Sequence, residues 1–437
     1  MGVDVLPPFD PALLDLADPY PVYRRYRERD PVHAVRSSGG ADGAGAGSTT
    51  WYLFGYAEVA RVLAERAYRR RSPVTGRAAP VPEGYETLRR VVENWLVFLD
   101  PPRHTRLRAR VNPPLGAAAV AGLRPAVREI AEELAGPLAA RPAADLVRGF
   151  AAPFPLLVIA RVLGVEGRLW PWFRERALAL QEAGGTRGDR SPAGLARADR
   201  AAGELERYFT AELTARRSSG GEPRDLMGAL ARAGREDDAL TVDVLASTCV
   251  HLLTAGHETT TGLLGKSVLA LLARPGTMAE LRAEPGLLAG AVDEFLRFDP
   301  PVQMVTRWAW RDTELAGRLV RRGDRLVAVL GSAHRDPARF PDPDVLDVRR
   351  ATGRHCAFGL GIHYCAGAAL ARLEAETGLA VLLDRLPLLR PEARPLVEVE
   401  YAPDWVFHGP SRLVLHTGND LPYSPVIPPE GIREEEP

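Results

Sequence analysis

The longest helical pattern in the sequence runs from Thr241 to Ala273, and it limits the possible folds more than any other feature. Thr241 and Asp243 are residue types that cap a helix start. Pro275 ends the pattern because proline lacks the backbone N–H that a helix interior needs. Shorter helical patterns precede it, separated by Pro and Gly: Tyr56–Ala67, Arg103–Val111, Leu123–Ala140 and Glu204–Arg217. The chain is therefore predicted to be mainly helical.

Strand-like segments are short and lie near both ends of the chain. Val32–Val35 and Trp51–Phe54 flank a Gly- and Ala-rich stretch, Gly39–Thr50, that is typical of a hairpin loop. Similar segments come late in the chain: Val302–Val305, Glu314–Leu315, Arg325–Leu330 and Arg412–His416.

The sequence contains no internal repeat and no clear linker between domains. The polar residues 184–190 separate two helical stretches and are expected to form a mobile lid. The segment after residue 420 is rich in Pro and acidic residues, which is typical of disorder. We expect a mainly α fold with small β-sheets, as one domain over residues 18–420. An N-terminal segment, residues 1–17, precedes it, and a disordered tail, residues 421–437, follows it.

Composition excludes several classes of protein. The 437 residues carry no formal net charge, so bulk charge gives no argument for binding nucleic acid. The three cysteines, Cys249, Cys356 and Cys365, are too few for a disulfide framework and favour a reducing compartment. Residues 1–10 lack the basic and apolar regions of a signal peptide, and no apolar run reaches the roughly 20 residues that cross a bilayer. We expect a cytoplasmic protein without a membrane segment.

A glycine-rich loop, Phe358–Gly367, leads into a helical pattern at Ala368–Leu383 and contains Cys365. A cysteine just before a helix has its thiolate favoured by the helix dipole and by free backbone N–H groups. Glycines let the backbone approach a flat cofactor, and His363 is placed to reach an acidic group on the edge of that cofactor. The loop therefore indicates a metal-binding thiolate beside a flat cofactor.

Two other interpretations of this loop stay open on the residues alone. A lone cysteine is most often a buried structural residue. Zinc is the second, because four possible ligands cluster: His355, Cys356, His363 and Cys365. Their spacings match none of the usual zinc patterns, and zinc does not require glycines between its ligands.

The loop resembles the haem-binding loop of the cytochrome P-450 family at all of the constrained positions: Phe358, Gly359, Gly361, His363, Cys365 and Gly367. The resemblance extends from Asp18 to His416 and is greatest to soluble bacterial members. It implies the cytochrome P-450 fold, a b-type haem bound through Cys365, and O₂ as co-substrate. A thiolate ligand increases electron density at iron and favours O–O cleavage.

The long helix has a second motif, in which His251, Ala255 and Thr259 share one face because they are four residues apart. Cleavage of dioxygen consumes protons, and a hydroxyl fed by a carboxylate can deliver them. The resemblance implies that role for Glu258 and Thr259, with the small Ala255 beside the haem. Without the Cys365 loop, the motif would fit an ordinary core helix with a solvated Glu258, and His251 would fit a packed histidine.

The resemblance also assigns residues that hold the haem and the core. Haem has two carboxylates that must be neutralised when buried. The resemblance implies haem contacts for His104, Arg108, Arg307, Phe358, Gly359, His363 and Gly367. Glu294 and Arg297 stand at i, i+3 and would join Arg350 in a buried structural group. Two places depart from the family pattern: Asn112-Pro113-Pro114, where an aromatic residue and a threonine are more common, and His334, where asparagine is common.

These features predict a haem-thiolate monooxygenase that oxidises a small organic substrate, in bacterial specialised metabolism. Electrons would come from a ferredoxin and its reductase, because the chain has no flavin or nicotinamide fingerprint. Arg106 and Arg110 are candidates for the donor's docking surface. Oxidative coupling or ring closure, peroxide-driven oxygenation and a non-catalytic haem sensor are the alternatives. By family position, the residues of the substrate pocket would be Leu96, Val97, His251, Ala255, Val302, Val305, Trp405 and Val406.

Overall fold

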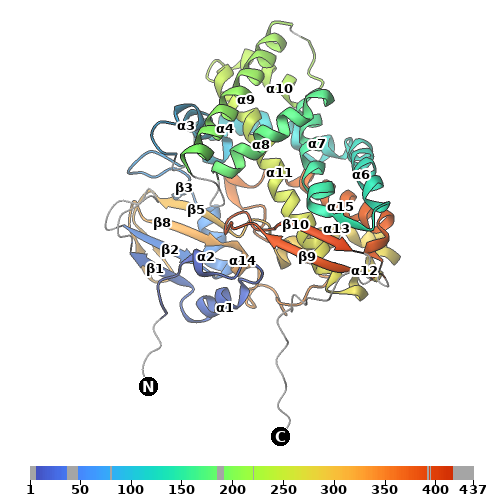
Figure 1. The fold of residues 1–437 in the computed structure, drawn as a ribbon. Helices are drawn as coiled ribbons and strands as arrows, with labels where there is room; N and C mark the ends of the chain where they lie inside the picture. The colour runs from blue at the N-terminus through green and yellow to red at the C-terminus, as the bar shows by residue number, and fades with distance from the viewer. Residues whose placement is uncertain are drawn as a thin grey trace.

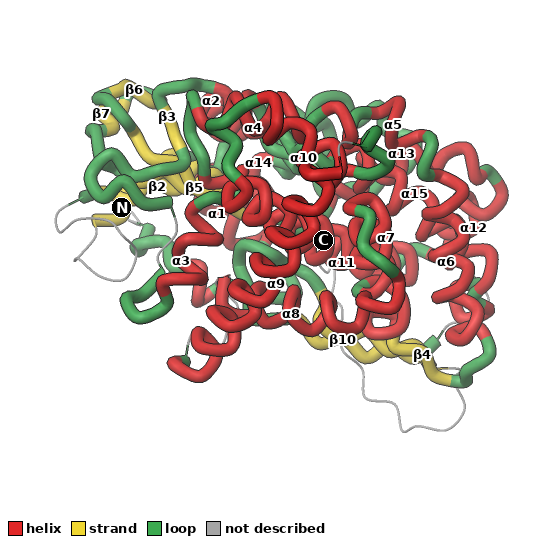
Figure 2. Tube along the Cα trace, turned by 90° about the horizontal axis from the view of Figure 1, so that it is seen from above, coloured by secondary structure: helices red, strands yellow, loops and turns green. Residues whose placement is uncertain are grey.

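The computed structural model describes residues 6–36, 48–78, 81–184, 191–219, 221–390, 393 and 395–416. Helices dominate this part of the chain. One group of strands lies at one side of the molecule, and a second, separate group lies beside the helices, as Figures 1 and 2 show from two directions. The predicted tail, most of the predicted hairpin loop and residues 185–190 of the predicted lid lie outside the described residues.

The strands form three small sheets. The largest has the order β1-β2-β8-β5-β3 and is antiparallel except where β2 runs parallel to β8. The second has the order β4-β10-β9, and the third consists of β6 and β7. The strands are β1 Val32–Arg36, β2 Thr49–Leu53, β3 Tyr68–Arg69, β4 Ala143–Asp145, β5 Met304–Ala309, β6 Thr313–Leu315, β7 Arg318–Val320, β8 Arg325–Val329, β9 Leu396–Tyr401 and β10 Pro410–His416.

The α-helices surround the longest of them, α11, which runs through the helical part of the molecule (Figure 1). They are α1 Tyr20–Arg29, α2 Tyr56–Ala64, α3 Glu86–Glu93, α4 Arg103–Val111, α5 Ala117–Ala121, α6 Arg124–Ala139, α7 Pro153–Leu163, α8 Trp170–Gly184, α9 Pro192–Ser219, α10 Leu226–Glu236, α11 Val242–Leu272, α12 Pro275–Ala283, α13 Leu288–Phe298, α14 Leu330–Ala333 and α15 Ala368–Arg385.

Helix α11 is central because its side chains are buried on all sides for most of its length. A helix that is apolar all round must lie inside a protein. Its N-cap is Thr241, whose hydroxyl accepts a hydrogen bond from the N–H of Val244 at 3.4 Å. Asp243 lies in the first turn and not at the cap. Pro275 does not terminate α11, which stops at Leu272, but opens the next helix, α12.

The predicted mainly α fold with small sheets is confirmed, although several boundaries differ. Helix α4 has the predicted bounds, whereas α9 is twice as long as the predicted Glu204–Arg217. The strand predicted at Val302–Val305 is β5, Met304–Ala309, because its pairing with β8 begins at Met304. Val302 instead forms an isolated bridge with Phe407.

The buried apolar residues divide into three clusters, one of which includes the N-terminal residues. The largest fills the helical part, and the second lies between the five-stranded sheet and α2. In the third, Phe9 and Leu14 pack with Tyr23, Tyr26 and Phe54. The described part of the N-terminal segment thus packs onto the domain, with no break at residue 18.

Candidate active site

The loop before α15 is held by its own backbone, which presents Cys365 at the start of that helix. The N–H of Cys365 donates to the carbonyl oxygen of Phe358 at 2.8 Å, and the N–H of Gly359 donates to that of Cys356 at 2.8 Å. Gly361 has φ +67°, and a Cβ there would lie 2.9 Å from the carbonyl oxygen of Leu63 in α2. Only glycine fits this approach without strain, so α2 fixes the loop from behind.

Cys365 differs from the other two cysteines because its side chain is accessible. Cys365 is exposed, whereas Cys249 and Cys356 are buried. Protein atoms around the sulfur still raise the pKa of the Cys365 thiol, and the N–H of Gly367 together with the charges of Arg108 and Arg372 opposes that rise. A metal ion bound at the sulfur would favour the thiolate further. Burial raises the pKa of Cys249 and of Cys356 to about 12, so these two remain thiols.

A group of cationic and imidazole side chains lies beside this loop. The rings of His104 and His363 are 4.3 Å apart, and Arg108 donates a hydrogen bond to the carbonyl oxygen of Tyr364. Arg307 lies within β5 and is buried. Both ring nitrogens of His104 and Nε2 of His363 are buried without a hydrogen-bond partner in the described part of the chain. Such a group lacks acceptors and is suited to bind an anion.

The pKa values of these side chains are lowered by burial and by neighbouring positive charges. Burial, and then the charges of Arg307 and other neighbours, lowers the pKa of His363 to about 2. Burial and the charge of Arg108 lower the pKa of His104 to about 4. Burial, and then the charge of Arg70, lowers the pKa of Arg307 to about 9. A cofactor with an iron for Cys365 and two carboxylates for these groups fits the residues present, and haem has both.

The second motif lies on a face of α11 that has an accessible alanine at its centre. Ala255 is exposed, although its neighbours along the helix are buried or half-buried. The hydroxyl of Thr259 donates to the carbonyl oxygen of Ala255 at 3.3 Å. Glu258 and Thr259 are both half-buried. Gly256 faces elsewhere: a Cβ there would lie 3.4 Å from the side chain of Ile159 in α7, so its smallness serves helix packing.

His251 lies two turns before Thr259 on α11 and is fixed by an aromatic neighbour. Its ring stacks on Trp95 with a centroid distance of 5.3 Å and an interplanar angle of 26°. Its Nδ1 is buried without a partner among the described residues. Burial, and then the charge of Arg70, lowers the pKa of His251 to about 3. The imidazole is therefore neutral near pH 7 and keeps one polar atom for a ligand.

Comparison with known proteins decides the family. The model for "Cytochrome P450" matches residues 195–407. The chain is 38% identical to cytochrome P450 monooxygenase PikC of Streptomyces venezuelae over 399 residues, which are 88% of this chain and 90% of that protein. It is 33% identical to 6-deoxyerythronolide B hydroxylase of Saccharopolyspora erythraea, covering 85% of this chain and 89% of that protein. The chain belongs to the cytochrome P450 family.

A solved structure gives the same answer for the fold of this P450. The crystal structure of P450BioI in complex with a hexadec-9Z-enoic acid ligated acyl carrier protein matches with a TM-score of 0.80 at 30% identity. The match covers 92% of this chain and 98% of that chain. This P450 is accordingly a monooxygenase that uses haem iron and O₂. None of the helices in the described part of the chain combines the length and apolar character needed to cross a bilayer.

The zinc alternative has no ligand set in this P450. Nowhere in the described residues do three or more His, Cys, Asp or Glu side chains gather closely enough to hold a metal ion. His355 has another role: its Nε2 lies 3.0 Å from the carboxylate of Asp293, and its Nδ1 accepts the N–H of Ala357 at 3.2 Å.

Glu294, Arg297 and Arg350 form one hydrogen-bonded group, in which Arg350 is half-buried. Glu294 and Arg297 are fully buried, and Arg350 donates to Oε1 of Glu294 at 3.2 Å. Arg297 also donates to the carbonyl oxygen of His334 at 3.1 Å. The ring of His334 accepts the N–H of Cys356 at 2.9 Å through Nε2. The histidine that departs from the family pattern thus links this group to Cys356, two residues before the loop.

The other departure from the family pattern, Asn112-Pro113-Pro114, lies in a connection between helices. Asn112 is the N-cap of a short 3₁₀ turn at Pro113–Leu115, directly after α4.

The two arginines predicted to dock the electron donor each face an acidic side chain. Arg110 pairs with Glu236 at 2.9 Å, and Arg106 lies 3.5 Å from the carboxylate of Asp237. A redox partner that used these two arginines would have to compete with those acids.

The predicted pocket residues pack against different clusters. Leu96 belongs to the large helical cluster, and Val97 next to it is half-buried. Val302 and Val305 pack against the sheet cluster, whereas Trp405 and Val406 pack against the N-terminal cluster. A hydrogen bond of 2.9 Å from the N–H of Gln303 to the carbonyl oxygen of Val406 brings the last two segments together.

Our sequence reasoning missed Arg70 and Trp95. Trp95 orients His251, as described above. Arg70 lies directly after β3 and donates to the carbonyl oxygens of Val97 and Thr306. The run Arg69-Arg70-Arg71 was the available signal, because three consecutive arginines beside apolar segments predict that at least one of them needs a partner inside the protein.

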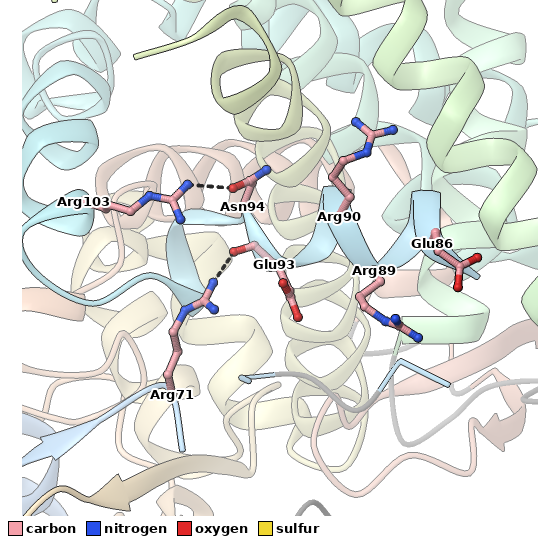
Figure 3. A pocket seen from close by; sticks show the side chains of 7 residues that line it. All are labelled: Arg71, Glu86, Arg89, Arg90, Glu93, Asn94 and Arg103. Carbon is pink, nitrogen blue, oxygen red and sulfur yellow. Dashed lines mark hydrogen bonds between the residues drawn. The ribbon is translucent and has the colours of Figure 1, made fainter. Parts of the chain in front are cut away.

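A separate polar cavity of about 240 Å³ lies beside α3 (Figure 3). Much of its positive charge is already engaged. Arg71 donates to the carbonyl oxygen of Glu93, Arg103 donates to Asn94 at 2.8 Å, and Arg90 pairs with Glu206. None of the predicted site residues lines it. The residues that line it are Arg71, Glu86, Arg89, Arg90, Glu93, Asn94 and Arg103.

Proposed function

We propose that this P450 hydroxylates, or otherwise inserts an oxygen atom into, a mainly apolar organic substrate of specialised metabolism, with Cys365 as the ligand of haem iron. One observation carries the proposal: the accessible Cys365 sulfur lies beside a largely buried group of cations and imidazoles, in which Asp100 is the one carboxylate of the described residues that acts on His104 and Arg307. His104, Arg108, Arg307 and His363 would hold the haem carboxylates. Phe358, Gly359 and Gly367 would lie against the ring. When bound, the haem supplies the iron centre that activates dioxygen.

The protons that the reaction consumes would pass through Thr259 and Glu258. The Thr259 hydroxyl both donates and accepts hydrogen bonds. Its present partner, the carbonyl oxygen of Ala255 at 3.3 Å, is distant enough to be exchanged for a closer one. Glu258 precedes it in α11 and is half-buried, so the carboxylate can exchange protons with solvent. Thr259 would orient the proton donor, and Glu258 would supply it.

The substrate would be recognised mainly through apolar contact. The predicted lining is apolar except for His251, and the small Ala255 leaves room above the haem. Because His251 is neutral near pH 7, it would hydrogen-bond a hydroxyl or carbonyl of the substrate and not pair with a charge. The named relatives include a 6-deoxyerythronolide B hydroxylase and a P450 bound to an acylated carrier protein. Polyketide-like or acyl compounds are therefore the first substrates to test.

Electrons would come singly from a ferredoxin and its reductase, in the cytoplasm. Neither a flavin nor a nicotinamide fingerprint occurs in the sequence. The exposed side chains of Ile362 and Tyr364, in the loop that carries Cys365, would lie within the docking surface. This arrangement would leave the opposite side of the haem to the substrate.

The test is a spectral screen followed by isotope labelling. The haem-loaded protein is titrated with polyketide, terpenoid, aromatic and acyl compounds, and displacement of the iron-bound water is followed in the haem spectrum. Each compound that binds is then turned over with ferredoxin, ferredoxin reductase and ¹⁸O₂. Products that carry one ¹⁸O atom support the proposal. A protein that never consumes O₂ with any binding compound would instead be a sensor or carrier.

A further inference from the structure

Arg70 reaches into the site from a segment that none of the family motifs includes. Its Nε donates to the carbonyl oxygen of Val97 at 2.8 Å, and its Nη1 donates to that of Thr306 at 2.7 Å. Its guanidinium also lies over the ring of Phe98, 5.3 Å from the centroid. Nη2 makes no hydrogen bond with the described residues. Arg70 is thus anchored by main-chain oxygens on two sides and keeps donors for a further partner.

A second guanidinium converges on the same oxygen. Nη1 of Arg307 also donates to the carbonyl oxygen of Thr306, at 3.0 Å. Two like charges held this close repel each other unless an anion lies between or beside them. Among the described residues, the carboxylate that acts on both guanidiniums is that of Asp100, which accepts the backbone N–H groups of Arg70 and Arg71, both at 3.1 Å. A single carboxylate does not neutralise both guanidinium charges.

The charges of the group balance only if the haem carboxylates are counted against Arg70 as well. Arg70, Arg108 and Arg307 are three cations, and Asp100 is one anion, so the excess is two positive charges. Guanidinium and carboxylate charges are permanent near pH 7, whereas the rings of His104 and His363 contribute hydrogen-bonding nitrogens. The charges of ferric iron, porphyrin ring and thiolate cancel, which leaves the two carboxylates of haem. The two haem carboxylates then equal the excess of two positive charges, whereas without Arg70 the protein would supply an excess of only one.

We propose that Arg70 is a third guanidinium of the haem-carboxylate site, beside Arg108 and Arg307, and that it ties this site to the segment at Val97 and Phe98. The inference rests on the proposed haem ligation by Cys365. Through its bond to the carbonyl oxygen of Val97, Arg70 holds one predicted wall of the substrate pocket in a fixed position relative to the haem. Arg70 is therefore both a cofactor-binding and a positioning residue.

The test compares Arg70→Gln with Arg70→Lys in the haem-loaded protein, without relying on turnover. Haem loss to excess apomyoglobin and the reduction potential are measured. Arg70→Gln should lose haem at least about tenfold faster, the ratio expected for one charge-assisted hydrogen bond. Its reduction potential should fall, because uncompensated negative charge favours ferric iron. Arg70→Lys keeps the cation and should stay close to wild type in both measurements.

Arg69→Gln is the matched control, because Arg69 is the neighbouring residue but stacks on Trp310 at 4.1 Å, away from the site. It should leave haem loss and potential unchanged. Arg307→Gln should resemble Arg70→Gln. Far-UV circular dichroism of each variant verifies that it is folded.

Three results would overturn the inference. The first is Arg70→Gln with wild-type haem loss and potential. The second is equal haem loss in the Gln and Lys variants, because main-chain packing and not charge would then be responsible. The third is a change confined to ligand affinity, in which Arg70→Gln weakens binding of hexadecanoate but not of hexadecanol. Arg70 would then serve an anionic substrate. If wild type itself shows no thiolate-ligated haem, the proposed function fails instead.

Discussion

The hydroxyl of Thr259 donates a 3.3 Å hydrogen bond to the carbonyl oxygen of Ala255, one turn earlier on α11. This bond is long, and Ala255 is exposed at the same place. A hydroxyl that is weakly held next to open space can rotate toward a ligand at little cost. The pair therefore marks the point on α11 where a proton donor can be oriented.

Thr259→Ala should separate reductant consumption from product formation. Haem binding, substrate binding and the first reduction do not need this hydroxyl, so they should stay normal. Misdirected protonation should release hydrogen peroxide in place of product. The ratio of product to NADPH consumed should fall, and Thr259→Ser should restore it. Thr254→Val serves as control, because Thr254 lies on the same helix but is buried, and its hydroxyl donates to the carbonyl oxygens of Val250 and His251. A Thr259→Ala enzyme coupled as well as wild type would refute the assignment.

Glu258→Gln should behave differently from Thr259→Ala, because it removes the proton source and leaves the hydroxyl in place. General acid catalysis contributes about 10²–10⁴-fold, so oxygen consumption should slow by an easily measured factor. The solvent isotope effect should increase, because proton delivery becomes limiting. An unchanged rate in H₂O and D₂O would place the proton source elsewhere, and His251 would be the next residue to test.

Cys365→Ala should abolish the strongly red-shifted Soret band that reduced, carbon monoxide-bound haem shows when a thiolate is its ligand. Cys249→Ser and Cys356→Ser are the matched controls. Both residues are buried, and burial raises the pKa of each thiol to about 12, so neither offers a thiolate. Both controls should keep the band. Loss of the band in Cys356→Ser alone would mean that the wrong cysteine of the loop had been chosen.

Glu294→Ala or Arg297→Ala should lower the free energy of unfolding by about 3–5 kcal/mol, because each leaves a buried charge unpaired. The pair is joined by two hydrogen bonds of 2.7 Å, and both side chains are fully buried. Arg128→Ala is the control: Arg128 also pairs within a helix, with Glu132 at 2.9 Å, but that pair is partly exposed. An exposed pair contributes about 0–1 kcal/mol. The free energy of unfolding is measured with denaturant. If Arg297→Ala and Arg128→Ala lower it by the same amount, the prediction is contradicted.

His251 should make this P450 sensitive to acid. Its pKa in the folded protein is lowered to about 3, first by burial and then by Arg70, whereas an unfolded histidine has its ordinary pKa of about 6.5. Between these values the unfolded state binds the extra proton. The free energy of unfolding should therefore fall as pH decreases below 6.5, by up to about 1.4 kcal/mol per pH unit.

His251→Phe keeps an aromatic ring beside Trp95 and removes the titration. Unfolding of the haem-loaded protein at pH 7.5, 6.0 and 5.0 provides the measurement. The variant should lose less stability on acidification than wild type, and the two should not diverge further above pH 7. Parallel pH dependences would show that protonation of His251 is not coupled to unfolding.

The sequence alone predicted those features that depend on interactions between residues close together in the chain. The bounds of α4 follow from the prolines before and after it, and the start of α11 follows from the Thr241 cap. The Cys365 loop is likewise held by backbone bonds within a few residues, such as that from Cys365 to Phe358. The family resemblance followed from the same short stretch, and the comparisons confirm it.

Tertiary structure decided what depends on distant partners. The strand near residue 304 begins where β8 pairs with it, and α9 extends to Pro192 because its first turns are buried against other helices. Arg70 was invisible to motif reasoning because its acceptors, the carbonyl oxygens of Val97 and Thr306, lie 27 and 236 residues away. The sequence determines the charge of a side chain. The oxygens and the like charges that surround this side chain are determined only by the packing of distant segments.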